Sequence, residues 1–155
     1  MPLKNFSKLL PAMLATVLAA QTSPTLTVAP VPTVKAKKGS VATVTVRAVL
    51  PPGFHANSNK PTDDYLIPLT IKWTGGPLQA DGIVYPKADL EKYSFSDKPL
   101  SVVTGEFTIT TKFKVPADAA QGPAAENGTI RYQACNDRMC FAAKNVPVTI
   151  SLNIE

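Results

Sequence analysis

Alternation of apolar and polar residues constrains this sequence more than any other feature. It is clearest over residues 106–115, where Phe107, Ile109 and Phe113 share one side of an extended chain and lysines and threonines fill most of the other. Successive side chains of a strand point to opposite faces, so the pattern predicts a strand with one buried and one solvated face. The 15 prolines of the 155-residue chain oppose a helical domain, because proline breaks helix interiors.

The same alternation predicts several more strands. They cover residues 41–48, 66–73, 129–135 and 145–154. Turn-forming pairs such as Gly75-Gly76 and Asn127-Gly128 lie between these runs. Strands punctuated by Gly and Pro turns predict an all-β protein, an immunoglobulin-like antiparallel β-sandwich, with a small barrel as the alternative.

The N-terminus has the layout of a secretory signal peptide. Lys4 and Lys8 are followed by an apolar run ending at Ala20, shorter than the roughly 20 apolar residues that cross a bilayer; the alternative is a disordered apolar tail. The organisation that we expect is a signal peptide over 1–20, a proline-containing leader over 21–37 and one domain over 38–155. Export would place the chain in an oxidising compartment, where disulfides persist.

The charge of the mature chain is small. Loss of Lys4 and Lys8 leaves 16 − 2 basic residues against 11 acidic ones, a net charge of +3. The densest basic cluster, Lys35, Lys37 and Lys38, lies beside a predicted turn and is interpreted as a solvated edge. The sequence therefore predicts no nucleic-acid partner, and we expect a monomer.

The only two cysteines, Cys135 and Cys140, are separated by four residues. A structural disulfide is one hypothesis, although closing so short a loop stabilises by only about 2 kcal/mol, against about 4.7 kcal/mol for a 100-residue loop. A structural zinc site needs four Cys or His ligands, and the single histidine, His55, lies far away in the sequence. We therefore expect neither a metal nor another cofactor.

A redox-active cysteine pair is the third hypothesis, and the local pattern favours it. In the strand predicted over 129–135, Cys135 lies on the face opposite Ile130 and Tyr132, and a polar turn follows it. This arrangement would place both sulfurs at an accessible hairpin tip, as thiol–disulfide exchange requires. Arg138 would lower the pKa of a nearby thiol and Asp137 would raise it, so both are candidate tuning residues. The alternative is that these two residues only make the tip soluble.

Three stretches, in order, resemble the N-terminal domain of the thiol:disulfide interchange protein DsbD family. They are GFHANSNKP at 53–61 followed by YLIP at 65–68, YSFS at 93–96 followed by PLSV at 99–102, and YQAC at 132–135 followed by Asp137 and Cys140. Together they extend over most of the chain between Val41 and Ile154.

This resemblance implies a periplasmic, immunoglobulin-like electron carrier. In that family a membrane-embedded donor reduces the cysteine pair, which then reduces exported proteins such as disulfide isomerases and thioredoxin-like proteins of cytochrome c maturation. The family pattern implies that Cys140 engages partners and that Cys135 resolves the mixed disulfide. It also implies an aromatic cap loop between Asp89 and Ser96, with Phe95 as the first candidate for the capping ring and Tyr93 as the second; the alternative is that these rings pack in a core.

The sequence also departs from the family pattern. The cysteines are one residue closer together, and Ala142 and Ala143 follow Phe141 where family members have two prolines. The chain contains no fused membrane donor, so we expect the reductant to be a separate membrane protein. For His55, which belongs to the matched pattern, a general-base role and a buried structural role both stay open.

These observations predict an exported thiol–disulfide interchange domain, that is, a protein-disulfide reductase or electron carrier that works through Cys135 and Cys140. The alternative is an exported binding or scaffold module in which the disulfide only rigidifies a hairpin. A third possibility is a folding or assembly factor without redox turnover.

Overall fold

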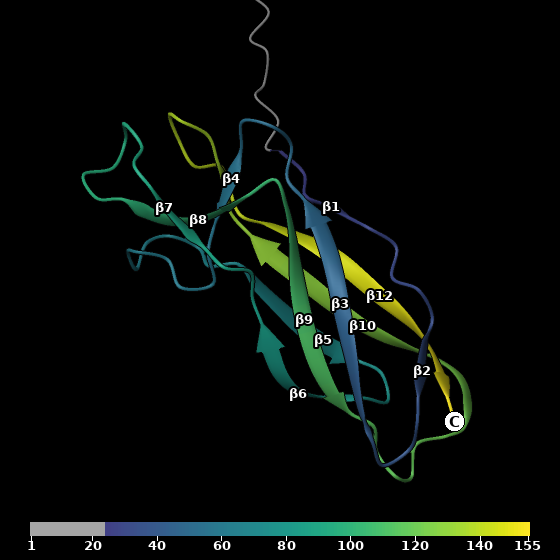
Figure 1. Ribbon diagram of the computed structural model, residues 1–155. Helices are drawn as coiled ribbons and strands as arrows, with labels where there is room; N and C mark the ends of the chain where they lie inside the picture. The colour runs from purple at the N-terminus through teal and green to yellow at the C-terminus, as the bar shows by residue number, and fades with distance from the viewer. Residues whose placement is uncertain (1–23) are drawn as a thin grey trace, which may run out of the picture.

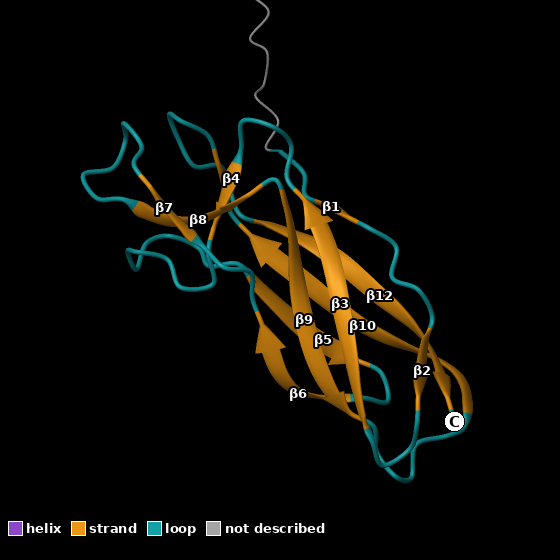
Figure 2. Ribbon diagram, viewed as in Figure 1, coloured by secondary structure: helices purple, strands orange, loops and turns teal. Residues whose placement is uncertain are grey.

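The computed structural model describes residues 24–155. The expected signal peptide therefore lies outside the described residues. The described chain consists of strands and loops (Figure 2). Within it, no helix is long and apolar enough to cross a membrane.

The first sheet of the sandwich is antiparallel. Its strand order is β1 (Thr27–Val28), β3 (Val41–Val49), β9 (Glu106–Lys114) and β6 (Gln79–Val84). β3 and β9 pair along their whole length, from Val41 opposite Lys114 to Val49 opposite Glu106. Every second residue of both strands is buried, so the alternation that predicted them marks the face that packs on the core.

The second sheet lies behind the first in Figure 1. Its strand order is β2 (Val34–Ala36), β12 (Lys144–Ile154), β10 (Gly122–Tyr132) and β5 (Thr70–Gly75). β10 and β12 are antiparallel throughout, from Gly122 opposite Ile154 to Tyr132 opposite Lys144. β2 runs parallel to β12.

The inner faces of these two sheets form the core. The largest fully buried side chains that they contribute are Val46, Ile109, Phe113, Ile130, Tyr132, Ile150 and Ile154. Trp73 of β5 packs edge-to-face on Phe113 of β9, with ring centroids 5.1 Å apart, and so links the two sheets. The expected all-β, immunoglobulin-like β-sandwich is confirmed.

The described part of the expected leader belongs to the sandwich, which corrects the interpretation of residues 21–37. β1 pairs with β3, and β2 pairs with β12. Leu26 is buried, and its backbone N–H donates to the hydroxyl of Tyr132 at 2.8 Å, while that hydroxyl donates to the carbonyl of Pro24 at 3.1 Å. The two strands have only two and three residues and are separated by prolines, so they show no alternation.

A third, smaller sheet lies at the end of the sandwich away from the C-terminus (Figure 1). Its strand order is β11 (Ala134–Cys135), β4 (His55–Asn57), β8 (Leu100–Thr104) and β7 (Asp89–Glu91), all antiparallel. One strand was predicted over 129–135, but β10 ends at Tyr132 and the chain crosses to the third sheet at Gln133.

The two faces of the third sheet meet different surroundings. The face toward the main core carries Ala56, Val103 and Ala134. His55 is paired with both Cys135 and Thr104, so these three side chains lie on the opposite face. The cysteine pair is therefore held on the outer face of a small sheet whose inner face is anchored in the core.

Candidate thiol–disulfide site

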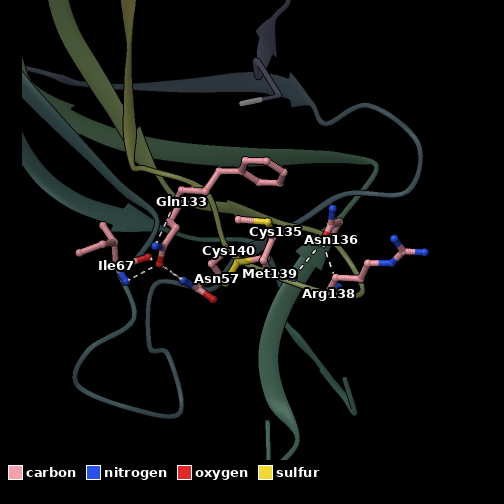
Figure 3. The surroundings of a disulfide bond; sticks show 9 residues. Asn57, Ile67, Gln133, Cys135, Asn136, Arg138, Met139 and Cys140 are labelled. Carbon is pink, nitrogen blue, oxygen red and sulfur yellow. Dashed lines mark hydrogen bonds between the residues drawn. A yellow bond between two sulfur atoms is a disulfide. The ribbon is translucent and has the colours of Figure 1, made fainter. Parts of the chain in front are cut away.

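Cys135 and Cys140 form a disulfide with an S–S distance of 1.99 Å (Figure 3). The hairpin that joins them is closed by two backbone hydrogen bonds. The N–H of Asn136 donates to the carbonyl of Met139 at 2.9 Å, and that of Phe141 donates to the carbonyl of Ala134 at 2.8 Å. The two cysteines therefore lie on opposite sides of one short, hydrogen-bonded hairpin.

Asn136 shapes the tip of this hairpin. Its side-chain oxygen accepts hydrogen bonds from the backbone N–H groups of Arg138 and Met139, each at 2.9 Å (Figure 3). An asparagine that binds the backbone two and three residues ahead stabilises a tight turn. This turn brings Cys140 back to Cys135 across a loop of only four residues.

The two cysteines differ in exposure. Cys135 has no exposed surface, whereas Cys140 is partly exposed. Cys135 does point away from Ile130 and the main core, as its position in the strand predicted, but other residues cover it. The expectation of two accessible sulfurs is therefore wrong for Cys135.

Gln133 stabilises the base of the hairpin through three side-chain hydrogen bonds, a role that the sequence pattern did not indicate. Its side-chain oxygen accepts hydrogen bonds from the side-chain amide of Asn57 at 3.0 Å and from the backbone N–H of Ile67 at 3.1 Å (Figure 3). Its amide nitrogen donates to the carbonyl of Phe141 at 3.1 Å. One side chain thus connects β4, the loop before β5 and the residue that follows Cys140.

An aromatic cover lies over the outer face of the third sheet. Tyr93 and Cys140 both pack on a small cluster of buried residues, Leu66, Leu100 and Val102. The ring of Phe95 stacks on the ring of Tyr93, with centroids 5.6 Å apart, and is 37% exposed. Both rings named from the sequence are therefore at the site, Tyr93 in the inner position and Phe95 in the outer one.

The segment that carries these rings is tied to its surroundings by two side-chain hydrogen bonds. The hydroxyl of Ser94 donates to the carbonyl of Asp137, in the hairpin tip, at 3.0 Å. The hydroxyl of Tyr93 donates to the carboxylate of Glu91. Burial, followed by this bond to Glu91, raises the pKa of Tyr93, so the phenol stays protonated.

His55 lies under the cover, directly opposite Cys135 in the pairing of β4 with β11. Its ring stacks on Tyr93 with centroids 4.0 Å apart, and the residue is 3% exposed. Burial lowers the pKa of His55, and the nearby carboxylate of Glu91 opposes this shift more weakly. The ring is therefore neutral at neutral pH, and its Nε2 has no hydrogen-bond partner among the described residues.

The two candidate tuning residues, Asp137 and Arg138, both lie exposed at the hairpin tip. The side chain of Arg138 points away from the disulfide (Figure 3). The tuning of a thiol by either residue stays a prediction. Among residues 24–155, no group of three or more His, Cys, Asp or Glu side chains is arranged to hold a metal ion.

Comparison with known proteins identifies the fold. No protein-family model and no curated protein matches the chain. Among solved structures, the N-terminal periplasmic domain of ScsB from Proteus mirabilis is similar, with a TM-score of 0.53 and 11% identity over 84% of this chain and 46% of that chain. This chain thus spans about half the length of the ScsB chain that it matches.

A second similar structure is the DsbD N-terminal domain of Neisseria meningitidis in its reduced form. Its TM-score is 0.48, with 19% identity over 71% of this chain and 77% of that chain. The fold implied by the motifs around Cys135 and Cys140 agrees with the similarity to ScsB. The described chain therefore shares the fold of the N-terminal periplasmic domain of ScsB, and its own disulfide lies at the edge of the third sheet.

Proposed function

We propose that this protein is an exported thiol–disulfide interchange domain that passes reducing equivalents through Cys135 and Cys140 to disulfides of other exported proteins. The observation that carries the proposal is the unequal exposure of a bonded pair: Cys140 is partly exposed and Cys135 is buried. Thiol–disulfide exchange through a cysteine pair needs one sulfur that a partner can reach and a second sulfur close enough to resolve the mixed disulfide.

The proposed reaction begins with the reduced pair. The thiolate of Cys140 attacks one sulfur of a partner's disulfide, and the partner's other sulfur leaves as a thiolate. Cys135, after losing its proton, then attacks the Cys140 sulfur of the mixed disulfide. The Cys135–Cys140 disulfide forms, the second partner thiolate leaves, and two electrons have passed to the partner.

The aromatic cover is proposed to control this reaction. Tyr93 packs on the same residues as Cys140, so its ring restricts access of small oxidants to the sulfurs. We therefore assign the capping ring to Tyr93, with Phe95 as an outer layer stacked on it. A docking partner would displace the segment by breaking the single hydrogen bond from Ser94 to the hairpin tip.

The partners are proposed from the sequence motifs and from the fold. Acceptors would be thioredoxin-like or disulfide-isomerase proteins, including those of cytochrome c maturation, and the donor would be a separate membrane thiol reductant. The apolar N-terminal run and the disulfide support a periplasmic or otherwise exported location. The ScsB domain of similar fold is itself periplasmic.

A non-catalytic binding or scaffold module is the second candidate function. Complete burial of Cys135 favours it, because structural disulfides are usually buried. Its weakness is the short loop, since such a cross-link stabilises the fold by only about 2 kcal/mol.

Trapping of mixed disulfides separates the two functions. Cys135→Ser leaves the exposed Cys140 with no resolving thiol, so it should accumulate mixed disulfides with a thioredoxin-like protein supplied in its oxidised form. Cys140→Ser is the matched control and should trap little, since the remaining Cys135 is buried. Two folded variants that both fail to trap would favour the structural disulfide.

A further inference from the structure

We propose that His55 is the proton acceptor for the thiol of Cys135 when that thiol resolves a mixed disulfide. The inference rests on the proposed function and adds a residue to it. His55 faces Cys135 in the strand pairing, is buried under the aromatic cover, and has a ring nitrogen with no partner among the described residues.

Two independent observations place the imidazole on the same face of the third sheet as the cysteines. Directly opposite residues of an antiparallel pair have Cβ atoms about 4.5–5.5 Å apart on the same face, which brings the ring within reach of Cys135. The second observation concerns Tyr93. Its ring stacks on that of His55 with centroids 4.0 Å apart, and it packs on the same cluster of buried residues as Cys140. The ring therefore lies in the covered layer that contains both cysteines.

The resolving step creates a need for such a group. Cys135 is fully buried, and an apolar environment raises the pKa of a thiol and so depletes the attacking thiolate. A neutral imidazole beside the sulfur accepts the S–H proton as the thiolate attacks Cys140. The sulfur–sulfur bond to the partner then breaks, the partner leaves as a thiolate, and the imidazolium holds the proton.

The proton has a route to solvent. A surface pocket of about 610 Å³ is lined by His55, Glu91, Tyr93, the β3–β4 loop and Asp137. The buried ring thus borders a pocket that opens to solvent. The charge of Glu91 favours the imidazolium while the proton is held, and the proton then passes to solvent through the pocket.

The groups that face the imidazole define its pH behaviour. They are Cys135 from β11, Glu91 from β7 and Tyr93 from the segment after β7, and Asp137 of the hairpin lines the same pocket. β8 contributes Thr104, which does not titrate. Tyr93 stays protonated, so the carboxylates and the cysteine set the charge around the ring.

The test is the reaction of the reduced protein with an aromatic disulfide whose released thiolate is coloured. The first release of colour reports the attack of Cys140 on the disulfide, and the second reports the resolution of the mixed disulfide by Cys135.

His55→Phe preserves a ring that can stack on Tyr93 but removes the nitrogen that accepts the proton. In this variant the second phase at neutral pH should slow by about a hundredfold or more, which is the lower end of the range for general acid–base catalysis. Its rise with pH should also move above the ordinary thiol pKa of about 8.5, because an apolar environment raises the pKa of a buried thiol.

The first phase is the internal control. It should change by less than about twofold, since general-base catalysis by His55 is not assigned to Cys140. A second phase that is unchanged in rate and pH profile would overturn the inference, and so would an equal slowing of both phases. His55→Gln, which also lacks a titrating ring, carries the same expectation if the phenylalanine variant does not fold.

A measurement on the unaltered protein keeps the inference testable without any variant. The chain has one histidine, so its ring signal in a nuclear magnetic resonance titration needs no assignment by mutagenesis. The pKa of His55 should differ between the disulfide and dithiol forms, because only the dithiol form places a titrating sulfur opposite the ring. An identical pKa in both forms would contradict the proposal. If instead the unaltered protein shows no second colour release, the proposed function itself fails, whatever His55 does.

Discussion

Gln133 connects three separate segments through one side chain. It satisfies the backbone N–H of Ile67 and the amide of Asn57 while it donates to the carbonyl of Phe141. These partners are part-buried, so losing Gln133 leaves polar groups without hydrogen bonds at the base of the hairpin. An unsatisfied buried donor or acceptor costs about 1–3 kcal/mol.

Gln133→Leu should therefore lower the free energy of unfolding by about 1–3 kcal/mol, measured by urea denaturation. Gln79→Leu is the matched control, because Gln79 is exposed on the edge strand β6 and should change stability by less than about 0.5 kcal/mol. Equal effects of the two substitutions would contradict the assigned role of Gln133.

Glu126 is a buried carboxyl on β10 whose oxygen accepts a hydrogen bond from the backbone N–H of Leu78 at 3.0 Å. Burial raises the pKa of Glu126, and the bond from Leu78 opposes the shift more weakly. The folded state then holds the proton more tightly than the unfolded state. The protonated carboxyl of Glu126 therefore stabilises the folded state at pH values below the ordinary glutamate pKa of 4.5. This contribution is lost as the pH rises through the pKa that Glu126 has in the folded protein.

Glu126→Gln removes this titration but keeps an oxygen that can accept from Leu78. The stability of the unaltered protein relative to this variant should fall as pH rises from 4.5 toward neutral, measured by urea denaturation at each pH. A relative stability that rises with pH would show that the carboxylate form is the one favoured by the fold.

Some residues of the site could be predicted from the sequence and others could not. Cys135 and Cys140 were found because the chemistry of a cysteine pair is visible in the sequence, whereas the two aromatic residues of the cover were found only because the family resemblance implied a cap loop there. Gln133 was not, because a glutamine shows its role only when its three partners are brought together by the fold. The pairing of His55 with Cys135 depends in the same way on a contact between strands far apart in the sequence.

At the scale of elements, three of the four long strands were predictable and the short ones were not. The exception, β10, has 11 residues, but only its last four were predicted as strand, because the Asn127-Gly128 pair inside it was interpreted as a turn. β3, β9 and β12 have 9 to 11 residues and alternate clearly between apolar and polar residues. β4, β7 and β11 have two or three residues, too few for a period to be recognised, and they form three of the four strands of the third sheet. The part of the fold that positions the disulfide is therefore the part that local sequence patterns describe least.

The cover segment after β7 is held to the hairpin by the bond from Ser94 to the carbonyl of Asp137. Ser94→Ala removes this bond and should favour opening of the cover. A hydrogen bond contributes about 0.5–1.5 kcal/mol, so reduction of the disulfide by dithiothreitol should become about two- to tenfold faster.

The matched control lies in the same segment. The hydroxyl of Ser96 bonds to the carbonyl of Lys98 and not to the hairpin, so Ser96→Ala should leave the reduction rate near that of the unaltered protein. If Ser94→Ala does not exceed this control, the segment does not limit access to the disulfide.

At the scale of the whole molecule, the sandwich supports a small reactive sheet at one end (Figure 1). The segment just before β1 is held by Tyr132, which is the last residue of β10 and lies three positions before Cys135. The buried hydroxyl of Tyr132 accepts a hydrogen bond from the backbone N–H of Leu26 and donates one to the carbonyl of Pro24. The first described segment therefore belongs to the domain and stabilises the strand that leads into the site.

Tyr132→Phe leaves the backbone N–H of Leu26 without its partner. It should lower the free energy of unfolding by about 1–3 kcal/mol in a single cooperative transition, followed by circular dichroism. Tyr65→Phe is the control, because Tyr65 is 72% exposed and its loss of a hydroxyl should have little effect. A loss confined to the N-terminal segment, with the rest of the transition unchanged, would argue that this segment is not integral to the fold.

The most direct test of the central claim is the redox state of Cys135 and Cys140 in the purified mature protein, equilibrated with glutathione and dithiothreitol buffers of graded potential. An interchange domain should pass reversibly between disulfide and dithiol while it stays folded, with a reduction potential above about −300 mV, where structural disulfides typically resist reduction. A pair that stays bonded below that potential until the chain unfolds would contradict the account, because the disulfide would then be a cross-link and not a carrier of electrons.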